Sequence, residues 1–365
     1  MTKPGYIVTH LYNDFSGSPR VLSDFCKSQE ILKNKTILIH SNTEGFLDEL
    51  PLEHWVFSYE FSNGKFLKII NFISGQVRLF FKTLKAIHRM NSRDLKPVII
   101  CNTVMSIGAI FAAGFRGCMT VLIVHEVSSH KIIYRLIKLL VPLFFIKVVV
   151  VSSFVGKRIK ISRDYIVLPN CLRSDFEVKA IYPELDRFNN KNILFVGSLK
   201  TYKGVFELLK ISSLCKDFNF IAAINSSHDE LHKFLEKNYV PDNLSMMARP
   251  DNLNELYQKS FLTMNLSRTD QWIETFGLTI LEAMSTGCPC IVPPEGGHLD
   301  YFTEDCGLII DSKMVSAISQ EIKLLGADFK RWNKYSIKSL EKAKDFSFAN
   351  YSKKVDNLLQ KLNLS

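Results

Sequence analysis

The chain is most constrained by the alternation of short apolar runs with segments of helical periodicity, which occurs twice along its length. Most apolar runs lack a hydrophobic–polar alternation, which is typical of parallel strands covered on both faces. Strands are predicted at residues 6–9, 36–40, 55–59, 97–101, 120–124, 147–151 and 165–168, and then at 192–197, 218–224, 244–247, 261–266, 289–292 and 307–310. Helices are predicted at 19–33, 203–215, 229–238, 253–260, 277–286 and 312–325. This pattern predicts an α/β fold with two doubly wound domains.

The length of 365 residues also favours two domains, since domains typically contain about 100–200 residues. The N-terminal domain is expected over residues 1–170 and the C-terminal domain over residues 191–345. Residues 171–190 have little periodicity and are predicted to connect the domains, and an amphipathic helix at 346–365 is expected to pack back onto the N-terminal domain. A hydrophobic content of 47% provides apolar material for two cores and excludes a disordered chain.

The cysteines and the N-terminus give expectations about the compartment. The eight cysteines match neither a disulfide framework nor a zinc spacing, so most are expected to be buried in a reducing cytoplasm. The chain enters its first predicted strand soon after Lys3 without the features of a leader, so no secretory signal is expected.

One hydrophobic segment, residues 132–151, raises the question of a membrane span. It contains basic residues, among them Arg135 and Lys138, which are costly in a bilayer core. We therefore expect a helix at about 130–140 followed by a buried strand at about 143–151.

The whole basic excess lies in the N-terminal half. Residues 1–170 carry 22 Lys and Arg against 11 Asp and Glu, a net charge of +11, whereas residues 171–365 carry 24 against 25. The stretch from Lys65 to Arg93 has seven basic residues and no acid, and the stretch from Val127 to Arg163 has eight. Basic residues near a membrane surface attract anionic lipids by about 1 kcal/mol each.

The first basic stretch also has helical spacing, with apolar residues on one face at Val77, Phe80, Phe81, Leu84 and Ile87. Two interpretations remain open: a core helix with a solvated basic side, and a helix that faces a membrane. The absence of acids favours the second. It predicts a membrane or acceptor face formed by Lys65, Arg78, Lys82, Lys85 and Arg89.

Three loops are candidates for binding phosphate, because ligands of open parallel sheets bind beyond the carboxyl ends of the strands. In the first, residues 13–20, Ser18 suits the N-cap position and Pro19 the first helical position. Gly17 would let the backbone approach an anion at the helix start. A plain capped turn explains the same residues. Neither a GxGxxG motif nor a Walker-type loop occurs in the sequence.

The second loop covers residues 194–204, where a buried strand ends at Gly197 and Lys203 lies at the start of a predicted helix. The helix dipole disfavours a lysine at this position, so a nearby anionic ligand would explain it. A solvated lysine is the alternative.

The third loop covers residues 274–284, in which Phe276-Gly277-Leu278 is predicted to open a helix. The free N–H groups at a helix start suit a diphosphate. Glu274 precedes the helix and Glu282 lies about one turn further in. Two carboxylates that flank a phosphate-binding helix start are not required by structure alone.

In these motifs the chain resembles the retaining glycosyltransferases of family 4, which have the GT-B fold of two Rossmann-like domains facing across a cleft. The E-x7-E motif extends from Glu274 to Glu282, and the strand–Gly…Lys-Gly element from Gly197 to Gly204. Further matches are the Gly-Gly loop at Gly296-Gly297, the His–acid pair His125-Glu126, Ser152-Ser153 and Pro169-Asn170.

The resemblance implies that the C-terminal domain holds a nucleotide-sugar and the N-terminal domain holds an acceptor. It implies that Lys203 stabilises the leaving diphosphate, that Glu282 binds the ribose and that Glu274 binds sugar hydroxyls. His125 is implied to contact the sugar from the opposite wall. The catalytic residues are then Glu274, His125 and Lys203, and the donor-binding residues are Gly17, Ser198, Lys203, Phe276, Gly277, Leu278 and Glu282.

Two departures from the family concern the identity of the donor. Ser198 stands where the family commonly has an arginine, for which Arg268 or Arg20 is a candidate replacement. The Gly-Gly loop continues with His298-Leu299-Asp300 where Pro and Glu are more usual. A UDP-sugar is the favoured donor, followed by GDP-mannose.

The sequence contains no Asp-x-Asp metal motif, so we expect transfer without a metal and with retention at the anomeric carbon. The expected acceptor is a saccharide linked to a polyprenyl diphosphate, in the synthesis of lipopolysaccharide O-antigen, capsule or exopolysaccharide. The protein is then expected to be cytoplasmic and peripheral on the inner face of the membrane.

Other functions remain open. They are a nucleotide-sugar epimerase or a phosphorylase of the same fold, and a binding protein without catalysis. Nucleic-acid binding is indicated only by the isoelectric point of about 9.1, and the sequence contains no motif that supports this function.

Overall fold

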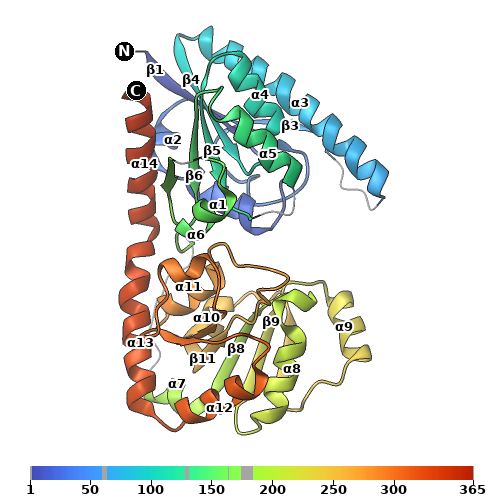
Figure 1. The fold of residues 1–365 in the computed structure, drawn as a ribbon, viewed down its shortest axis with the longest axis vertical. Helices are drawn as coiled ribbons and strands as arrows, with labels where there is room; N and C mark the ends of the chain where they lie inside the picture. The colour runs from blue at the N-terminus through green and yellow to red at the C-terminus, as the bar shows by residue number, and fades with distance from the viewer. Residues whose placement is uncertain (1, 60–63, 128–130, 163, 174–183, 365) are drawn as a thin grey trace. The chain divides into compact units, whose positions relative to one another are not determined.

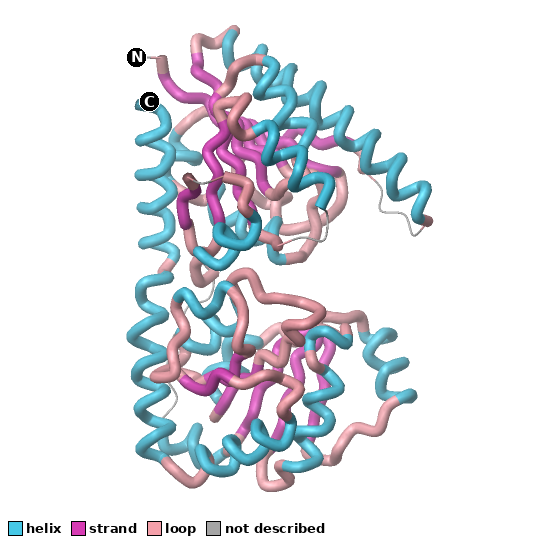
Figure 2. Tube along the Cα trace, viewed as in Figure 1, coloured by secondary structure: helices cyan, strands magenta, loops and turns pink. Residues whose placement is uncertain are grey.

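A computed structural model of the chain describes all residues except 1, 60–63, 128–130, 163, 174–183 and 365. The chain forms two compact units, one of Met1–Asn170 with Phe348–Ser365 and one of Cys171–Ser347. Each unit contains a parallel sheet surrounded by helices (Figures 1 and 2). The predicted α/β fold class is therefore confirmed.

The N-terminal unit contains a seven-stranded parallel sheet in the order β3-β2-β1-β4-β5-β6-β7. Its strands are β1 (Lys3–Thr9), β2 (Thr36–Ser41), β3 (Glu53–Phe57), β4 (Leu95–Asn102), β5 (Met119–Val124), β6 (Ile146–Val150) and β7 (Tyr165–Val167). Each overlaps a predicted strand. The strand order reverses between β1 and β4, which makes the carboxyl ends of these two strands the switch point where such sheets bind ligands.

The helices of this unit are α1 (Gly17–Cys26), α2 (Gln29–Lys33), α3 (Lys65–Asn91), α4 (Ile107–Phe115), α5 (Lys131–Leu140), α6 (Ser153–Ile159) and α14 (Phe348–Leu364). Helices α3 and α4 pack side by side, and α14 packs on α1 and α2 (Figure 1). The backbone N–H of Glu30 in α2 donates to Asp356 of α14 at 2.8 Å.

The structure corrects two predictions at the start of the chain. The helix predicted at 19–33 is two helices, because Ser28 adopts an extended conformation between them. The first helix begins at Gly17 with Ser16 at the N-cap position, in place of Ser18. Asp14 causes the earlier start, since its carboxylate accepts a hydrogen bond from the Ser16 backbone N–H at 3.0 Å and turns the chain there.

The C-terminal unit contains a six-stranded parallel sheet in the order β10-β9-β8-β11-β12-β13. Its strands are β8 (Asn192–Gly197), β9 (Asn219–Ile224), β10 (Leu244–Ala248), β11 (Leu262–Met264), β12 (Cys290–Val292) and β13 (Gly307–Ile309), and each overlaps a predicted strand. The order reverses between β8 and β11, which is the switch point of this sheet.

The helices of the C-terminal unit cover this sheet. They are α7 (Glu184–Asn190), α8 (Val205–Leu214), α9 (His228–Lys237), α10 (Leu253–Lys259), α11 (Leu278–Ser285), α12 (Val315–Leu325) and α13 (Phe329–Ala343). Short 3-10 turns lie at Thr201–Lys203, Gly297–Asp300 and Lys344–Phe346. The fifteen-residue helix α13 was not among the predicted helices.

The predicted connection at 171–190 needs a correction, because its last seven residues form α7. Arg187 anchors this helix in the C-terminal unit, where its side chain is 1% exposed. Its guanidinium donates to the Ser260 carbonyl at 3.1 and 3.3 Å and to the Thr286 carbonyl at 2.7 Å. It also lies 5.7 Å from the ring centre of Trp332. Residues 174–183 of the predicted connection lie outside the described part of the chain.

The hydrophobic segment 132–151 divides as predicted into helix α5 and strand β6. Within the described residues, none of the helices has both the length and the apolar character needed to cross a bilayer. All eight cysteines are buried and unbridged, as expected.

Arg187 provides a test of the packing of α7. Replacing it with alanine removes the guanidinium donors of two buried carbonyl groups, so Arg187→Ala should lower the free energy of unfolding of the C-terminal unit by about 2–4 kcal/mol. Urea unfolding followed by tryptophan fluorescence measures this change. The exposed Lys210→Ala in α8 serves as control and should change stability by less than about 0.5 kcal/mol. Equal stabilities of the two variants would contradict the anchoring role.

Candidate active site

Two residues that the sequence predicts to be catalytic form an ion pair in the C-terminal unit. The ammonium group of Lys203 contacts Oε1 of Glu274. The same oxygen accepts a hydrogen bond from the Ser267 hydroxyl at 2.8 Å. The side chains of Lys203 and Glu274 are only 23% and 15% exposed. The two residues are 71 positions apart in sequence, so the fold alone brings them together.

The position of the pair follows from the sheet topology. Lys203 lies in the loop after β8, and Glu274 lies in the loop after β11, so both loops leave the carboxyl ends of the two strands at the switch point. Glu274 also forms a parallel β-bridge with Gly296, which follows β12. Its carbonyl accepts from the Gly297 N–H at 2.7 Å. Glu274 therefore connects three loops, two through its side chain and the third through its backbone.

The turn that carries Lys203 is fixed by its neighbours. Gly204 has a φ of 84°, and a side chain there would meet the Leu266 carbonyl at 2.2 Å, so this position requires glycine. The Tyr202 and Trp272 rings stack with centres 5.2 Å apart, and the Lys203 ammonium lies 5.2 Å from the Trp272 ring centre. Ser267, Tyr202 and Trp272 were not predicted from the sequence. They lie in the loops that follow β8 and β11, the same loops that carry the predicted pair, and this position is the one feature of the sequence that could have indicated them.

The electrostatics keep Glu274 ionised. Burial raises the pKa of Glu274, but the charge of Lys203 and the hydrogen bonds from Lys203 and Ser267 outweigh burial, so its pKa lies below the ordinary value. The site therefore presents a carboxylate beside an ammonium group, partly shielded from water.

The predicted helix start forms next to this pair. Helix α11 begins at Leu278, and Gly277 precedes it with a φ of 83°, a conformation that favours glycine. The Tyr301 hydroxyl holds the turn by donating to the carbonyls of Phe276 and Gly277 at 3.0 and 2.8 Å. The first amides of an α-helix have no partner inside the helix, so this turn offers donors to an anion.

Glu282 lies in the second turn of α11 and is buried. Its Oε2 accepts from the Tyr257 hydroxyl at 3.1 Å, and its Oε1 lies 3.4 Å from Nε of Arg173. Both carboxylate oxygens therefore have protein partners. Its assignment to the ribose of a donor stays a prediction.

The candidates for the missing arginine differ in position. Ser198 follows β8 and is half-buried. The Arg268 backbone N–H donates to the Tyr202 carbonyl, which holds Arg268 beside the Lys203 turn, while its guanidinium lies 3.7 Å from Glu207 and 3.5 Å from Asp270. Arg20 belongs to the N-terminal unit and lies 3.6 Å from Asp24.

His298 stands where the family pattern differs, and it is completely buried in the Gly-Gly loop. Its Nε2 lies 2.8 Å from the Pro293 carbonyl, to which it donates. Burial lowers the pKa of His298, so the ring is neutral. The histidine supports the loop that follows β12.

A second polar cluster lies at the switch point of the N-terminal sheet. His10 follows β1, Asn102 ends β4 and His125 follows β5. The Asn102 side chain lies 3.1 Å from Nδ1 of His10 and 2.5 Å from Nε2 of His125, and all three residues are buried. Burial lowers the pKa of His10 to about 4, and burial together with His10 lowers the pKa of His125 to about 3.

Two neighbours complete this cluster. Burial raises the pKa of Glu126, which follows His125, to about 7. Gly17 opens α1, and a side chain built on it would meet no atom within 4 Å, so the backbone is accessible there. The structure thus brings the predicted His125 together with His10 and Asn102, which were not predicted.

The predicted basic face on α3 is only partly free. Arg89 lies 3.1 Å from Glu53 and Arg78 donates to the Ser58 carbonyl. Lys85 lies 5.8 Å from the Trp55 ring centre, and Lys82 is half-buried. Lys65 is the first residue of α3, and its side chain lies outside the described part.

The predicted apolar face of α3 needs a correction. Ile87 is buried, but Val77 and Phe81 are 49% and 62% exposed. The buried stripe of the helix consists of Leu79, Thr83, Ala86, Ile87 and Met90. The first turns of α3, at the end that projects from the unit in Figure 1, are exposed all round and carry Phe66, Leu67, Ile69, Ile70 and Ile73. Only the C-terminal half of α3 is therefore a core helix.

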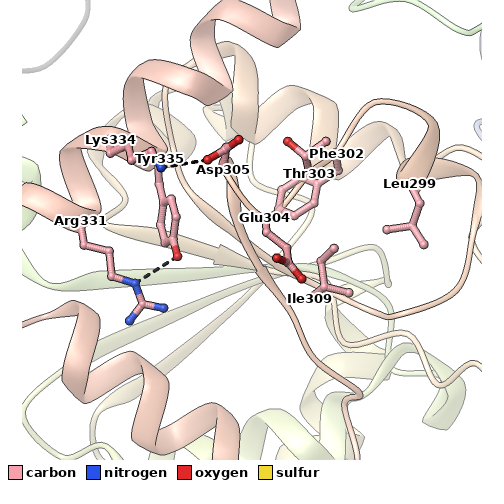
Figure 3. A pocket seen from close by; sticks show the side chains of 9 residues that line it. All are labelled: Leu299, Phe302, Thr303, Glu304, Asp305, Ile309, Arg331, Lys334 and Tyr335. Atoms are coloured by element: carbon pink, nitrogen blue, oxygen red, sulfur yellow. Dashed lines mark hydrogen bonds and ion pairs between the residues drawn. The ribbon is translucent and has the colours of Figure 1, made fainter.

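A surface hollow of about 770 Å³ lies elsewhere in the C-terminal unit (Figure 3). It is lined by Leu299, Phe302, Thr303, Glu304, Asp305, Ile309, Arg331, Lys334 and Tyr335. Its cations already have partners, because Lys334 lies 2.9 Å from Asp305 and Arg331 lies 2.9 Å from Glu321. The predicted site residues do not line it, so we assign the candidate active site to the switch point.

Comparison with solved structures defines the fold of the chain. The chain covers 99% of a glycosyltransferase from Rickettsia africae ESF-5, with a TM-score of 0.79 over 99% of its own length and 17% identity. It is also similar to HepE from Anabaena, solved in complex with UDP and glucose, with a TM-score of 0.77, 16% identity and coverage of 98% and 100% of the two chains. The fold is thus GT-B, as predicted.

Comparison with sequences gives the family. Residues 183–339 match the family described as "Glycosyl transferases group 1". A poly(glycerol-phosphate) alpha-glucosyltransferase from Bacillus subtilis (strain 168) is 27% identical over 125 residues, which are 34% of this chain and 18% of that protein. Sucrose-phosphate synthase 1 from Arabidopsis thaliana is 34% identical over 82 residues, 22% and 8% of the respective lengths. The chain thus spans less than a fifth of the length of these relatives.

Residues 183–339 thus match the glycosyl transferases group 1, which agrees with the resemblance of the chain's motifs to the retaining family 4. The matched region contains the Lys203–Glu274 pair and the start of helix α11.

The ion pair predicts a shift in titration. In Lys203→Met the lowering influence of the ammonium group is lost while burial remains, so the pKa of Glu274 should rise and the carboxylate should take up a proton at a higher pH than in the unaltered chain. Carbon-13 NMR of the glutamate carboxyl groups follows this titration. An unchanged pKa of Glu274 in the variant would contradict the pairing.

Proposed function

We propose that the chain is a retaining glycosyltransferase that moves a hexose from a nucleotide-sugar, with a UDP-sugar favoured, to a saccharide acceptor. The observation that carries the proposal is the Lys203–Glu274 pair beside the start of α11, at the switch point of the C-terminal sheet. HepE, which has the same fold, was solved with UDP and glucose, and this supports UDP-glucose as the first donor to test.

The cationic part of the site suits the departing group. When the bond between the anomeric carbon and the phosphate oxygen breaks, negative charge develops on the diphosphate. Lys203 and the amides of Phe276, Gly277 and Leu278 lie in one region and supply positive charge and N–H donors without a large rearrangement. Preorganised donors of this kind stabilise the transition state, and they leave no step that requires a metal ion.

The carboxylate suits the sugar. Among the described residues, both contacts of the Glu274 carboxylate fall on Oε1, which leaves Oε2 to accept hydrogen bonds from sugar hydroxyls. The ionised group also stabilises the positive charge that develops on the sugar ring as the bond breaks. The acceptor oxygen then bonds to the anomeric carbon on the face that the phosphate leaves, and its proton passes to the departing phosphate oxygen. This sequence of bonds retains the anomeric configuration.

The remaining predicted residues take supporting roles in this proposal. Glu282 binds the ribose after exchanging a protein partner, and Ser198 lies beside the diphosphate. Arg268 is preferred to Arg20 as the replacement for the missing arginine, because its backbone is bonded to the turn that carries Lys203. In the N-terminal unit His125 contacts the sugar. Gly17 has no side chain, so a ligand can approach the backbone there.

The alternatives differ in their products. An epimerase or a phosphorylase of the same fold would not deliver a hexose from UDP-glucose to water or to a saccharide, and a binding protein would release no UDP. The combination of Lys203, Ser267 and Glu274 around one oxygen favours a catalytic site over a binding site alone.

Transfer to water tests this proposal without a known acceptor. Incubated with UDP-glucose, the protein should release UDP and glucose that is initially in the α form, which proton NMR detects before mutarotation. Lys203→Met and Glu274→Gln should each lower the rate by about 10²–10³, the typical loss for one electrostatic group. Lys200→Met, an exposed lysine three residues before Lys203, should retain the rate. Release of β-glucose, or full activity in both site variants, would refute the proposal.

We also propose that the acceptor is lipid-linked, in cell-surface polysaccharide synthesis such as that of O-antigen, capsule or exopolysaccharide, and that the protein acts at the cytoplasmic membrane face. The support comes from α3, whose exposed apolar end carries Phe66, Ile69 and Ile73. The same unit carries the basic excess of the chain. An apolar helix end within a basic unit suits a surface of anionic lipid.

Vesicle binding tests the membrane proposal. Replacing Phe66, Ile69 and Ile73 with serine should weaken binding to vesicles of phosphatidylglycerol and phosphatidylcholine at least about tenfold, because less apolar area enters the bilayer. Tyr239→Ser, a 79% exposed aromatic residue of the C-terminal unit, is the control and should bind as before. Co-sedimentation at low and high salt measures both. Equal binding of all proteins would contradict the role of α3.

A further inference from the structure

The buried cluster in the N-terminal unit contains an asparagine whose orientation can be deduced. The Asn102 Nδ2 lies 3.1 Å from the carbonyl oxygen of Ser18 in α1. A carbonyl oxygen only accepts hydrogen bonds, so the amide nitrogen of Asn102 must face it. The same nitrogen lies 3.1 Å from Nδ1 of His10. Turning the amide around would place Oδ1 against the Ser18 carbonyl oxygen, so the contact with Ser18 fixes the orientation of the amide.

This orientation fixes the proton on His125. With its nitrogen committed, Asn102 presents Oδ1 to Nε2 of His125 at 2.5 Å. An amide oxygen only accepts, so Nε2 must carry the hydrogen. Burial favours the neutral ring. In a neutral ring with hydrogen on Nε2, Nδ1 carries a lone pair and acts as an acceptor.

We propose that Asn102 is a positioning residue that holds His125 in the tautomer protonated at Nε2, so that Nδ1 accepts a hydrogen bond from a hydroxyl group of the bound sugar. The identity of the group on Nδ1 rests on the proposed function. The tautomer rests only on the contacts of Asn102. His125 therefore orients a hydroxyl and does not donate a proton to the diphosphate.

The arrangement also links three elements. Asn102 ends β4, His125 follows β5 and Ser18 lies in the first turn of α1, next to Gly17. Asn102 is completely buried, so its amide oxygen and nitrogen depend on protein partners for their hydrogen bonds. The charged and titratable groups around the cluster are His10, His40, Asp14 and Glu126. Burial lowers the pKa of His10 and His40 lowers it further, whereas Asp14 raises it.

Nitrogen-15 NMR of the imidazole rings tests the proposal in the free protein. In the unaltered chain His125 should show hydrogen on Nε2 only, between about pH 6 and 8. Asn102→Leu, which has the same branching and the same number of side-chain heavy atoms, removes the acceptor and should give a mixture of the two tautomers. Asn102→Asp keeps an acceptor for Nε2 and should restore the single tautomer, while its negative charge raises the pKa of both histidines.

Kinetics should follow the tautomer. Asn102→Leu should lower kcat for UDP-glucose turnover at least about tenfold, because a ring with hydrogen on Nδ1 offers a donor in place of an acceptor. Asn102→Asp should regain activity only above the raised histidine pKa, which adds an acidic limb to its pH profile. Thr36→Val, which deletes another buried hydrogen bond of this unit, controls for lost stability and should leave the His125 tautomer unchanged.

The outcomes separate the two proposals. Hydrogen on Nδ1 of His125 in the unaltered chain, or an unchanged single tautomer in Asn102→Leu, overturns the role of Asn102 whatever the activity. A single Nε2 tautomer that depends on Asn102, in a protein that turns over no nucleotide-sugar, supports the positioning and overturns the proposed function. A tautomer that depends on Asn102, with kcat unchanged in Asn102→Leu, overturns the hydrogen bond to the sugar.

Discussion

The ion pair between Lys203 and Glu274 is the interaction on which the C-terminal site depends. Each charge loses water on burial, and their attraction and the hydrogen bond from Ser267 to the shared oxygen act against this cost. A pair of apolar side chains would hold the same loops at least as well, so stability alone does not explain the charges. The proposed function explains them, because its ligand is negative at its phosphates and gains positive charge on its sugar.

Both sheets place their polar groups where the strand order reverses. In the C-terminal sheet the loops after β8 and β11 carry Lys203 and Glu274, and in the N-terminal sheet β1, β4 and β5 end at His10, Asn102 and His125. Parallel strands expose their carboxyl ends at one edge of a sheet, and at the switch point the connections leave in opposite directions and open a crevice. The two halves share this architecture but differ in chemistry: one is charged, whereas the other is a chain of neutral hydrogen-bonding groups.

The sequence predicted all the strands of the described structure. It predicted only some of the helices and only some of the residues at the candidate site. Every strand was predicted because buried parallel strands are nearly continuous apolar runs, as in Val148–Val149–Val150. Helices α4, α6, α7 and α13 were not predicted. Helices α7 and α13 carry many charges, and their anchors Arg187 and Trp332 are single buried residues. Lys203, Glu274 and His125 were predicted through motifs. Ser267, Trp272 and Asn102 have no local signature, since their role comes from contacts that only the folded chain creates.

The claim that Lys203 receives a diphosphate is tested most directly by comparing two nucleotides. UDP carries a second phosphate that UMP lacks, and calorimetry gives the affinity of the unaltered chain and of Lys203→Met for each. The account predicts that the unaltered chain binds UDP at least about tenfold more tightly than UMP, a difference of about 1.4 kcal/mol, and that the variant loses this preference. An undiminished preference for UDP in the variant would contradict the account, because the second phosphate would then be bound elsewhere.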